Sequence, residues 1–553
     1  MLERWLVAVV AVVLPIAYSW GTYDHYVIPK LLLARGLVLT LGILFAARCI
    51  ASGRVTIKRT PLGIALIALL LSAAVSTAFS VNLNVSIFGT YGRYDGLLTL
   101  GTYVAMFWLV SQTICGPGDA RFVLRALLTG GYVVAAVAIL QFLRDSLTVH
   151  GAVRAYGTMG NSDILGAFLA LLIPVAYGEV LAAKTAGARW LAINALVVMA
   201  LALLLAVSRS AWLGVLVAAV VLVLGRQWPV WRSRLALAAL GVAAAAVAGV
   251  AVVALEHGLS TAGLVSSPET LSSRLHVWGD TLPLIASRPF VGYGLDSFGL
   301  VYPAFQTGNW GQYQQFDKAH SELLQVAATQ GALGVASYLW LLGSFVVAFW
   351  RGRDQPAAWS LSAGWVAYQV TLQLNFTAIA AAFPFWMFSA AAIAVWTGGR
   401  TSRVWSMPLG SVPKAALAAL GAALVLLAIP ALVLAYLADH KLQDAVTADA
   451  ASQGNPAGLA ADARRLAPQE SVYAVEAGNI AFERRDWEGA REAYVEAARL
   501  GTFNPQMFRN LAFADQALGR KGDALAAARQ AVYLDRFDPV NQAVLAQIEA
   551  LSP

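Results

Sequence analysis

Charged residues are scarce in this sequence: only 12% of its 553 residues are Asp, Glu, Lys or Arg. A soluble domain carries about 25% charged residues, so much of this chain does not need a surface that faces water. Only two cysteines are present, Cys49 and Cys115, which excludes a disulfide framework. Because 59% of the residues are hydrophobic, the composition instead indicates an all-α, polytopic membrane protein.

Several motifs for nucleotide and metal chemistry are also absent. The sequence contains no Walker motif, no H-E-x-x-H, no C-x-x-C and no nucleophile elbow. Gly292, Gly294 and Gly299 indicate a tight turn, but their spacing is not that of a dinucleotide-binding fingerprint. No nucleic-acid-binding motif accompanies the net charge of +8. These absences remove support for an ATPase, a zinc protease or a nucleic-acid-binding protein.

Long apolar runs are what the sequence does have. A membrane span needs about 20 predominantly apolar residues. The run 190–225 would form a helix of roughly 54 Å, too long for a bilayer core of about 30 Å, so we place a break at Ser208-Arg209-Ser210. The run 379–397 could be a span or a re-entrant segment. About thirteen spans are predicted at 3–20, 30–50, 62–80, 97–114, 121–143, 163–183, 189–207, 210–225, 235–255, 321–350, 357–374, 379–397 and 413–437.

The basic residues predict the orientation of these spans. Residues 1–438 form the predicted membrane body and hold 26 basic and 14 acidic residues. With the N-terminus in the cytoplasm, Arg4 and the inner loops carry 17 of those 26 basic residues. Cytoplasmic loops of membrane proteins are enriched in Lys and Arg, so this orientation is favoured. An odd number of spans then places the C-terminal part outside the cytoplasm.

Two segments outside the spans stand out. The loop at about 256–319 is predicted to be extracytoplasmic, and its many aromatic residues predict a folded segment, because disordered chains are poor in aromatics. The tail, 439–553, contains 12 basic and 16 acidic residues and no long apolar run. Small residues recur in it at a period of 34, with Ala490 matched by Ala524 and Ala497 by Ala531. This period is typical of tetratricopeptide-like helical repeats, and 440–470 could be a degenerate first unit.

Polar residues at the predicted outer face are the candidates for function, because charge near a bilayer is costly. Four arginines stand out there: Arg93, Arg154, Arg209 and Arg274. Lys and Arg are usually enriched in cytoplasmic loops, so arginines at the outer interface need another explanation. Anion binding is therefore favoured over a simple interfacial position in which the side chain extends toward water. His320 stands where the long loop ends and a helix begins. Free backbone N–H groups at a helix start also suit an anion.

Five segments together resemble the O-antigen ligase and polymerase superfamily of bacterial envelope glycosyltransferases. They are GTYGRYDGLLTL at 89–100, RAYGTMGNSDILGAFLALLIP at 154–174, SRSAWLG at 208–214, RLHVWGDTLPLIASRPFVGYGLDSF at 274–298 and AHSELLQVAATQGALGV at 319–335. With the layout of the spans, the resemblance covers about residues 1–437. It implies an enzyme of the bacterial cytoplasmic membrane that transfers a glycan from an undecaprenyl-diphosphate carrier to a lipid, glycan or protein acceptor.

The resemblance also implies roles for single residues. Arg209 and Arg274 match arginines that would hold the diphosphate, and Arg93 and Arg154 match further basic positions. His320 matches a position implied to serve as the general base or to orient the acceptor. Glu322 also matches, and it could orient His320 or act as the base itself. The chain departs from the family pattern at Ser321, where asparagine is common, and at Leu323, where tyrosine is common.

Other functions are also compatible with the sequence. A polymerase or a protein O-oligosaccharyltransferase of the same superfamily would share the motifs. A transporter of lipid-linked glycans would be expected to show internal repeats among its spans, and none is evident. No acidic cluster suited to Mg²⁺ is evident either, so a metal-independent transfer without a cofactor is expected. Membrane lipids, and a protein partner for the tail, are the further interactions that the sequence predicts.

Overall fold

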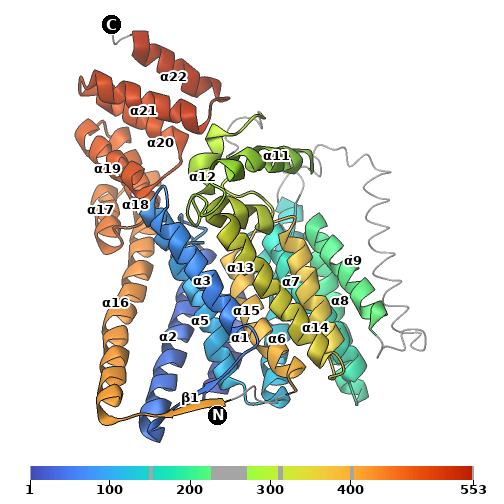
Figure 1. The fold of residues 1–553 in the computed structure, drawn as a ribbon. Helices are drawn as coiled ribbons and strands as arrows, with labels where there is room; N and C mark the ends of the chain where they lie inside the picture. The colour runs from blue at the N-terminus through green and yellow to red at the C-terminus, as the bar shows by residue number, and fades with distance from the viewer. Residues whose placement is uncertain (1, 149–152, 226–270, 309–314, 399–403, 551–553) are drawn as a thin grey trace, which may run out of the picture.

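The computed structural model describes residues 2–148, 153–225, 271–308, 315–398 and 404–550. They form an upright bundle of helices with a smaller helical tail at one end (Figure 1). The bundle helices are α1 (Leu2–Ile16), α2 (Val27–Ser52), α3 (Gly63–Ala78), α4 (Leu83–Phe88), α5 (Leu97–Thr113), α6 (Pro117–Thr148), α7 (Ser162–Ala182), α8 (Ala186–Leu205), α9 (Arg209–Leu224), α13 (Glu322–Gly352), α14 (Ala358–Leu372), α15 (Ile379–Trp396) and α16 (Ser411–Ala450), with the short 3₁₀ helix η1 (Gly157–Met159).

The apolar runs fold as the sequence predicts. A helix occupies every range predicted as a span except 235–255, which lies outside the described residues. Within the described residues, seven helices are long and apolar enough to cross a membrane, and α3, α5 and α9 are shorter apolar helices. The chain is therefore a multi-pass membrane protein. The count of thirteen spans stays a prediction, because α1 and α14 have only 15 residues each, about 22 Å of helix.

The break predicted inside the long run 190–225 is confirmed. Helix α8 ends at Leu205 and α9 begins at Arg209. Between them Val207 adopts φ 51°, a left-handed conformation that interrupts a helix. The other ambiguous run forms α15, a helix of 18 residues that is buried along almost its whole length among the other helices.

Two short strands are the exception to the all-α prediction. Strand β1 (Arg54–Lys58) pairs antiparallel with β2 (Val404–Pro408), with Arg54 opposite Pro408 and Lys58 opposite Val404. The pair ties the segment after α2 to the segment before α16. Sequence reasoning did not predict it, because each strand is only five residues long and its partner is some 350 residues away.

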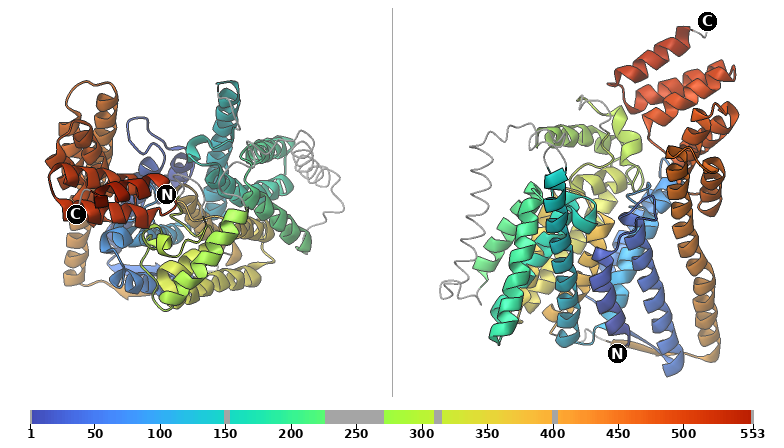
Figure 2. Two further views of the ribbon diagram at one scale, coloured as in Figure 1. Left: turned by 90° about the horizontal axis from the view of Figure 1, so that it is seen from above. Right: turned by 180° about the vertical axis from the view of Figure 1, so that it is seen from behind.

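The two ends of the bundle carry different structural elements. The N-terminus and the β1–β2 pair lie at one end, and the tail lies at the other with α11 (Leu271–Ser287) and α12 (Phe298–Val301) (Figures 1 and 2). Together with η3 (Tyr302–Ala304), these short helices form a small core around Val277, Leu284 and Phe298. The described part of the predicted loop 256–319 is thus folded, as its aromatic content indicated.

The tail is a stack of antiparallel helices. Its members are α17 (Pro456–Leu466), α18 (Ser471–Glu483), α19 (Trp487–Leu500), α20 (Pro505–Ala517), α21 (Lys521–Leu534) and α22 (Pro539–Ala550). Helices α18, α20 and α22 start at residues 471, 505 and 539, so each start follows the last by 34 residues, the period seen in the sequence. The predicted domain boundary after 438 falls inside α16, one continuous helix of 40 residues.

Polar contacts fasten the tail to the bundle. The Asn84 side chain donates to the carbonyls of Gln469 (3.0 Å) and Leu500 (3.1 Å). On α16, the buried Asp439 accepts hydrogen bonds from the hydroxyls of Tyr91 (2.5 Å) and Tyr473 (3.1 Å). The loop after α21 contacts η3 as well, through a hydrogen bond from Arg536 to the Pro303 carbonyl. The tail therefore rests on α4, on the loop that follows α4 and on η3.

A glycine in this interface makes the docking testable. Gly501 has φ +96°, and a Cβ there would lie 2.5 Å from Val85 Cγ2 on α4. We expect Gly501→Ala to loosen the tail from α4, which amide hydrogen exchange would detect as faster exchange over residues 82–88. Gly519→Ala is the matched control, because Gly519 has φ +74° but nothing within 4 Å. Both variants bear the left-handed backbone cost of about 1–2 kcal/mol. Equal exchange at α4 in the two would contradict the expectation.

Candidate functional site

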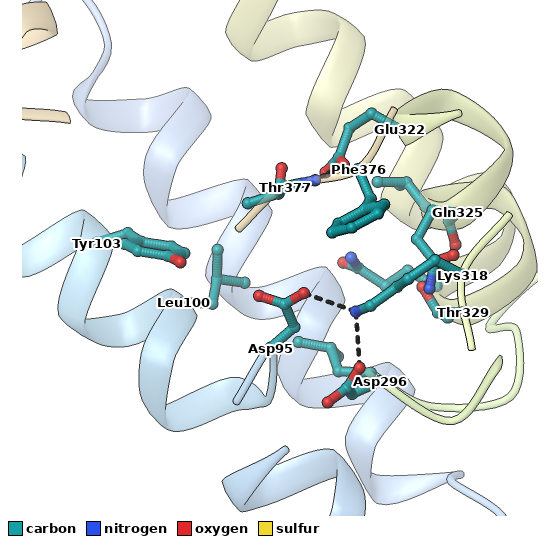
Figure 3. A pocket seen from close by; sticks show the side chains of 13 residues that line it. Asp95, Leu100, Tyr103, Asp296, Lys318, Glu322, Gln325, Thr329, Phe376 and Thr377 are labelled. Carbon is teal, nitrogen blue, oxygen red and sulfur yellow. Dashed lines mark hydrogen bonds and ion pairs between the residues drawn. The ribbon is translucent and has the colours of Figure 1, made fainter. Parts of the chain in front are cut away.

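A small cavity of about 90 Å³ lies where the loop before α5 meets the start of α13 and the turn between α14 and α15 (Figure 3). This volume suffices for a few water molecules but is below the 300–1,000 Å³ typical of pockets that enclose a drug-sized ligand. A large substrate would therefore have to lie mostly outside it. The lining residues are Asp95, Leu100, Tyr103, Leu295, Asp296, Lys318, Glu322, Gln325, Val326, Thr329, Gln330, Phe376 and Thr377.

A buried lysine is at the centre of this cavity. Lys318 is 2% exposed, and its Nζ lies 2.6 Å from Asp95 Oδ2 and 2.7 Å from Asp296 Oδ1 (Figure 3). Burial lowers the pKa of Lys318, but the two carboxylates outweigh burial and hold that pKa above its ordinary value. The ammonium group therefore stays charged and joins the loop before α5 to two segments that lie more than 200 residues later in the sequence.

Arg93 lies beside this cluster, as one of the predicted site residues. Its Nε donates to Asp317 Oδ2 at 2.5 Å, and its guanidinium lies 4.5 Å from the centre of the Phe376 ring. Burial raises the pKa of Asp317, but the adjacent Arg93 outweighs burial and keeps that pKa below its ordinary value. The charge of Arg93 is thus already balanced by a carboxylate in this structure.

His320 and Glu322 lie together, on either side of Ser321. The His320 ring is buried between the edges of Phe316 and Phe376, with ring centroids 5.7 and 5.4 Å away. Glu322 is in the first turn of α13, lines the cavity and accepts a hydrogen bond from the backbone N–H of Thr377 at 3.2 Å. Ser321 occupies the N-cap position between them, and both side chains contact the α14–α15 turn, His320 at Phe376 and Glu322 at Thr377.

Arg274 reaches the same turn from α11. Its Nη1 donates to the Leu374 carbonyl at 2.7 Å, two residues before Phe376. The structure therefore brings three of the predicted site residues, Arg274, His320 and Glu322, to the α14–α15 turn, and Arg93 joins them through Phe376.

Arg209 and Arg154 lie at the neighbouring α8–α9 turn. Arg209 is exposed at the start of α9, and the next residue, Ser210, accepts a hydrogen bond from Thr371 near the end of α14 at 3.5 Å. Arg154 donates to the carbonyls of Ala206 and Val207 and pairs with Asp163 at 3.2 Å. Arg154 thus holds the turn that presents Arg209.

Unusual backbone conformations gather around these residues. Tyr94, Val207, Asp296 and His320 all have φ between 50° and 56°, a region that residues other than glycine seldom adopt. Each lies within two residues of a predicted site residue or belongs to the Lys318 cluster. Such conformations cost about 1–3 kcal/mol each and concentrate at functional sites, so they support a site here.

Sequence reasoning missed Lys318, Asp95, Asp296 and Asp317 as members of this site. All four belong to, or directly precede, the segments that carried the family resemblance, and charged residues are rare in this chain. That scarcity was the available signal. In the described part of the chain, no group of three or more His, Cys, Asp or Glu side chains is arranged to hold a metal ion.

Asp95 yields a prediction about pH. Burial raises its pKa to about 6, with Lys318 opposing the rise and Asp296 adding to it. A raised carboxyl pKa contributes stability below the unfolded value of about 4, and this contribution is lost as pH rises through 6. Between about pH 5 and pH 8, the free energy of unfolding of wild type should therefore fall by on the order of 1 kcal/mol more than that of Asp95→Asn, because the asparagine side chain stays neutral.

Thermal unfolding of the purified protein in detergent at both pH values would measure this difference. Asp462→Asn, at an exposed position of the tail, is the control and should show no such pH dependence. A stability difference between Asp95→Asn and wild type that is the same at both pH values would count against the raised pKa.

The fold and site together define a multi-pass membrane protein with a polar, strained site at the end of its bundle that faces the tail. Residues 194–339 match the family model described as O-Antigen ligase. That family consists of membrane enzymes that transfer glycans. The matched segment contains Arg209, Arg274, His320 and Glu322, whereas Arg93 and Arg154 lie before it. No curated protein gave a match.

Proposed function

We propose that this protein transfers a glycan from an undecaprenyl-diphosphate carrier to an acceptor at the outer face of the bacterial cytoplasmic membrane. The observation that carries the proposal is the O-antigen ligase match over 194–339. Its four candidate residues, Arg209, Arg274, His320 and Glu322, lie at two adjoining turns of one end of the bundle. This end would be extracytoplasmic, with the N-terminus inside, as the basic inner loops favour.

In this proposal the arginines have two kinds of role. Arg209 and Arg274 bind the diphosphate, since guanidinium groups can stabilise the charge that develops on the leaving group. Arg93 and Arg154 each have a carboxylate partner, Asp317 and Asp163. We therefore assign them first to positioning the two turns, and their contribution to donor binding stays secondary.

The reaction itself is one displacement at the anomeric carbon. The acceptor oxygen forms a bond to that carbon while the bond to the diphosphate oxygen breaks, and the diphosphate leaves with the electron pair. The acceptor proton passes to Glu322 or His320, one of which must come within hydrogen-bond reach of the hydroxyl. The configuration at the anomeric carbon is inverted, and the transfer is expected to proceed in the presence of EDTA.

Transfer with a synthetic polyprenyl-diphosphate glycan and purified protein tests the donor-binding roles. We expect Arg209→Ala and Arg274→Ala each to lower the rate by roughly 10²–10³, the loss typical for one preorganised donor to a developing anion. Arg189→Ala is the matched control, because Arg189 is exposed at the opposite end of the bundle. Full transfer by both site variants would refute these roles.

The products of the same assay distinguish the remaining candidate functions. A lipid product indicates a ligase, a lengthened lipid-linked glycan a polymerase, and a glycosylated protein an oligosaccharyltransferase. Movement of the lipid-linked glycan across a vesicle membrane without any product would instead support a transporter. The tetratricopeptide-like tail is proposed to serve the acceptor or a protein partner.

A further inference from the structure

A second cavity, of about 410 Å³, lies between the tail and the bundle. Its volume falls within the range of pockets that enclose small ligands. Three residues of the bundle, Thr90, Tyr91 and Gln315, form one wall. The opposite wall comes from four tail segments, which are the start of α18, the α19–α20 turn, α20 and the α21–α22 turn.

Hydroxyl and amide side chains are the most numerous polar groups of this cavity. Thr502, Asn504 and Gln506 line it from the tail, beside the ring of Phe503. Across from them, Gln315 lines the wall that the bundle forms. Hydroxyl and amide groups can both donate and accept hydrogen bonds, so an oxygen-rich ligand would be favoured in this cavity.

The charged groups of the cavity already have partners. Arg509 donates to Asp538 at 2.8 Å, Glu476 accepts from the Tyr23 hydroxyl at 3.1 Å, and Asp535 accepts from two backbone N–H groups. Because three acidic side chains and one basic side chain line the cavity, a diphosphate would be repelled. Because the carboxylates are engaged, a cationic peptide is not required to balance them. A neutral ligand rich in hydroxyls fits best.

The cavity wall is continuous with the candidate site. The backbone N–H and hydroxyl of Thr90 donate to Asp296 Oδ2 at 2.6 and 2.9 Å, and Asp296 pairs with Lys318. Gln315, which also lines the cavity, lies two residues before Asp317, the partner of Arg93. A ligand in the cavity would thus lie against the outer surfaces of the two loops whose other side chains build the site.

We propose that this cavity is a binding site for a neutral stretch of glycan, held between the tail and the bundle during transfer. The assignment rests on the proposed function, because it supposes that a glycan reacts nearby. The glycan belongs either to the donor or to the acceptor, and both offer the same hydroxyl chemistry.

Kinetics of the full chain in detergent test the proposal and identify the source. We expect Gln506→Ala to raise KM by roughly five- to tenfold, the effect of one hydrogen bond, with kcat changed less than twofold. Varying the donor at saturating acceptor, and then the reverse, shows which substrate carries the effect. Gln516→Ala, on the same helix but outside the cavity lining, is the matched control and should leave both KM values unchanged.

Direct binding separates failure of this proposal from failure of the proposed function. The probe is the oligosaccharide released by mild acid from the lipid-linked donor, followed by calorimetry with wild type, Gln506→Ala and Gln516→Ala. Weaker binding to Gln506→Ala alone supports the cavity even if no transfer is found. Unchanged KM values and unchanged binding in Gln506→Ala, with transfer lost in Arg274→Ala, overturn the cavity and leave the function standing. Displacement of the oligosaccharide by a lysine-rich peptide would also overturn it.

Discussion

Lys318→Met is expected to destabilise the folded protein by about 3–5 kcal/mol, the cost of removing one partner from a buried ion pair. In wild type, the Lys318 ammonium compensates two carboxylates, Asp95 and Asp296, of which Asp296 is 1% exposed. Without the lysine, both largely buried carboxylates lose their counter-charge, and a buried uncompensated charge is costly. Thermal unfolding in detergent should show a melting temperature several degrees below that of wild type.

Two further variants make this expectation specific. Lys184→Met, at an exposed position before α8, should unfold as wild type does. The triple variant Lys318→Met, Asp95→Asn, Asp296→Asn removes the orphaned charges and should recover most of the loss, since replacing a whole buried ion pair is often close to neutral. If Lys318→Met had the same melting temperature as wild type, the Lys318 cluster would not stabilise the fold as the structure indicates.

The largest effect on chemistry is expected at the start of α13. Glu322→Gln and His320→Ala should each lower kcat for glycan transfer. Substitution of the residue that acts as the base should lower kcat by a factor of about 10²–10⁴. The geometry favours Glu322, because its carboxylate lines the cavity while the His320 ring lies between two aromatic edges. Glu322→Gln preserves the shape of the side chain and removes only its capacity to take a proton.

The pH dependence of kcat distinguishes the two residues. Loss of the base should abolish the limb on which the rate rises with pH, and loss of an orienting group should leave that limb in place at a lower rate. The controls are Glu492→Gln, at a position 79% exposed in the tail, and His25→Ala, at the same end of the bundle. Retained transfer in Glu322→Gln, His320→Ala and Arg274→Ala alike would refute the proposed site.

Much of the fold could be predicted because its signals are local. Each apolar run forms its helix through hydrogen bonds within the run, so the run itself predicts the position of the helix. The interruption at Ser208–Ser210 was predictable from length alone, since one helix could not fit the bilayer. The 34-residue period of the tail could be read because it matches the spacing at which helices α18, α20 and α22 begin. The β1–β2 pair carried no such local signal.

The candidate site was predicted in part for a related reason. Arg209, Arg274, His320 and Glu322 lie in segments whose order and spacing resemble a known family, so their positions could be carried over. Which charges are already paired could not be predicted, because pairing depends on distance in space. Both Arg93 and Arg209 were predicted to belong to the site, but only the structure pairs Arg93 with Asp317 and leaves Arg209 exposed.

Composition and periodicity along the chain were sufficient to predict the membrane class, the helical ranges, the break before α9 and a polar C-terminal tail. The fold was needed to show that Lys318 joins Asp95, 223 residues away, to Asp296, 22 residues away. The fold was also needed to show that the tail rests on α4 and the loop after it. A buried charge is stable only where the fold supplies its counter-charge, and no property of the chain near Lys318 specifies which carboxylates those are.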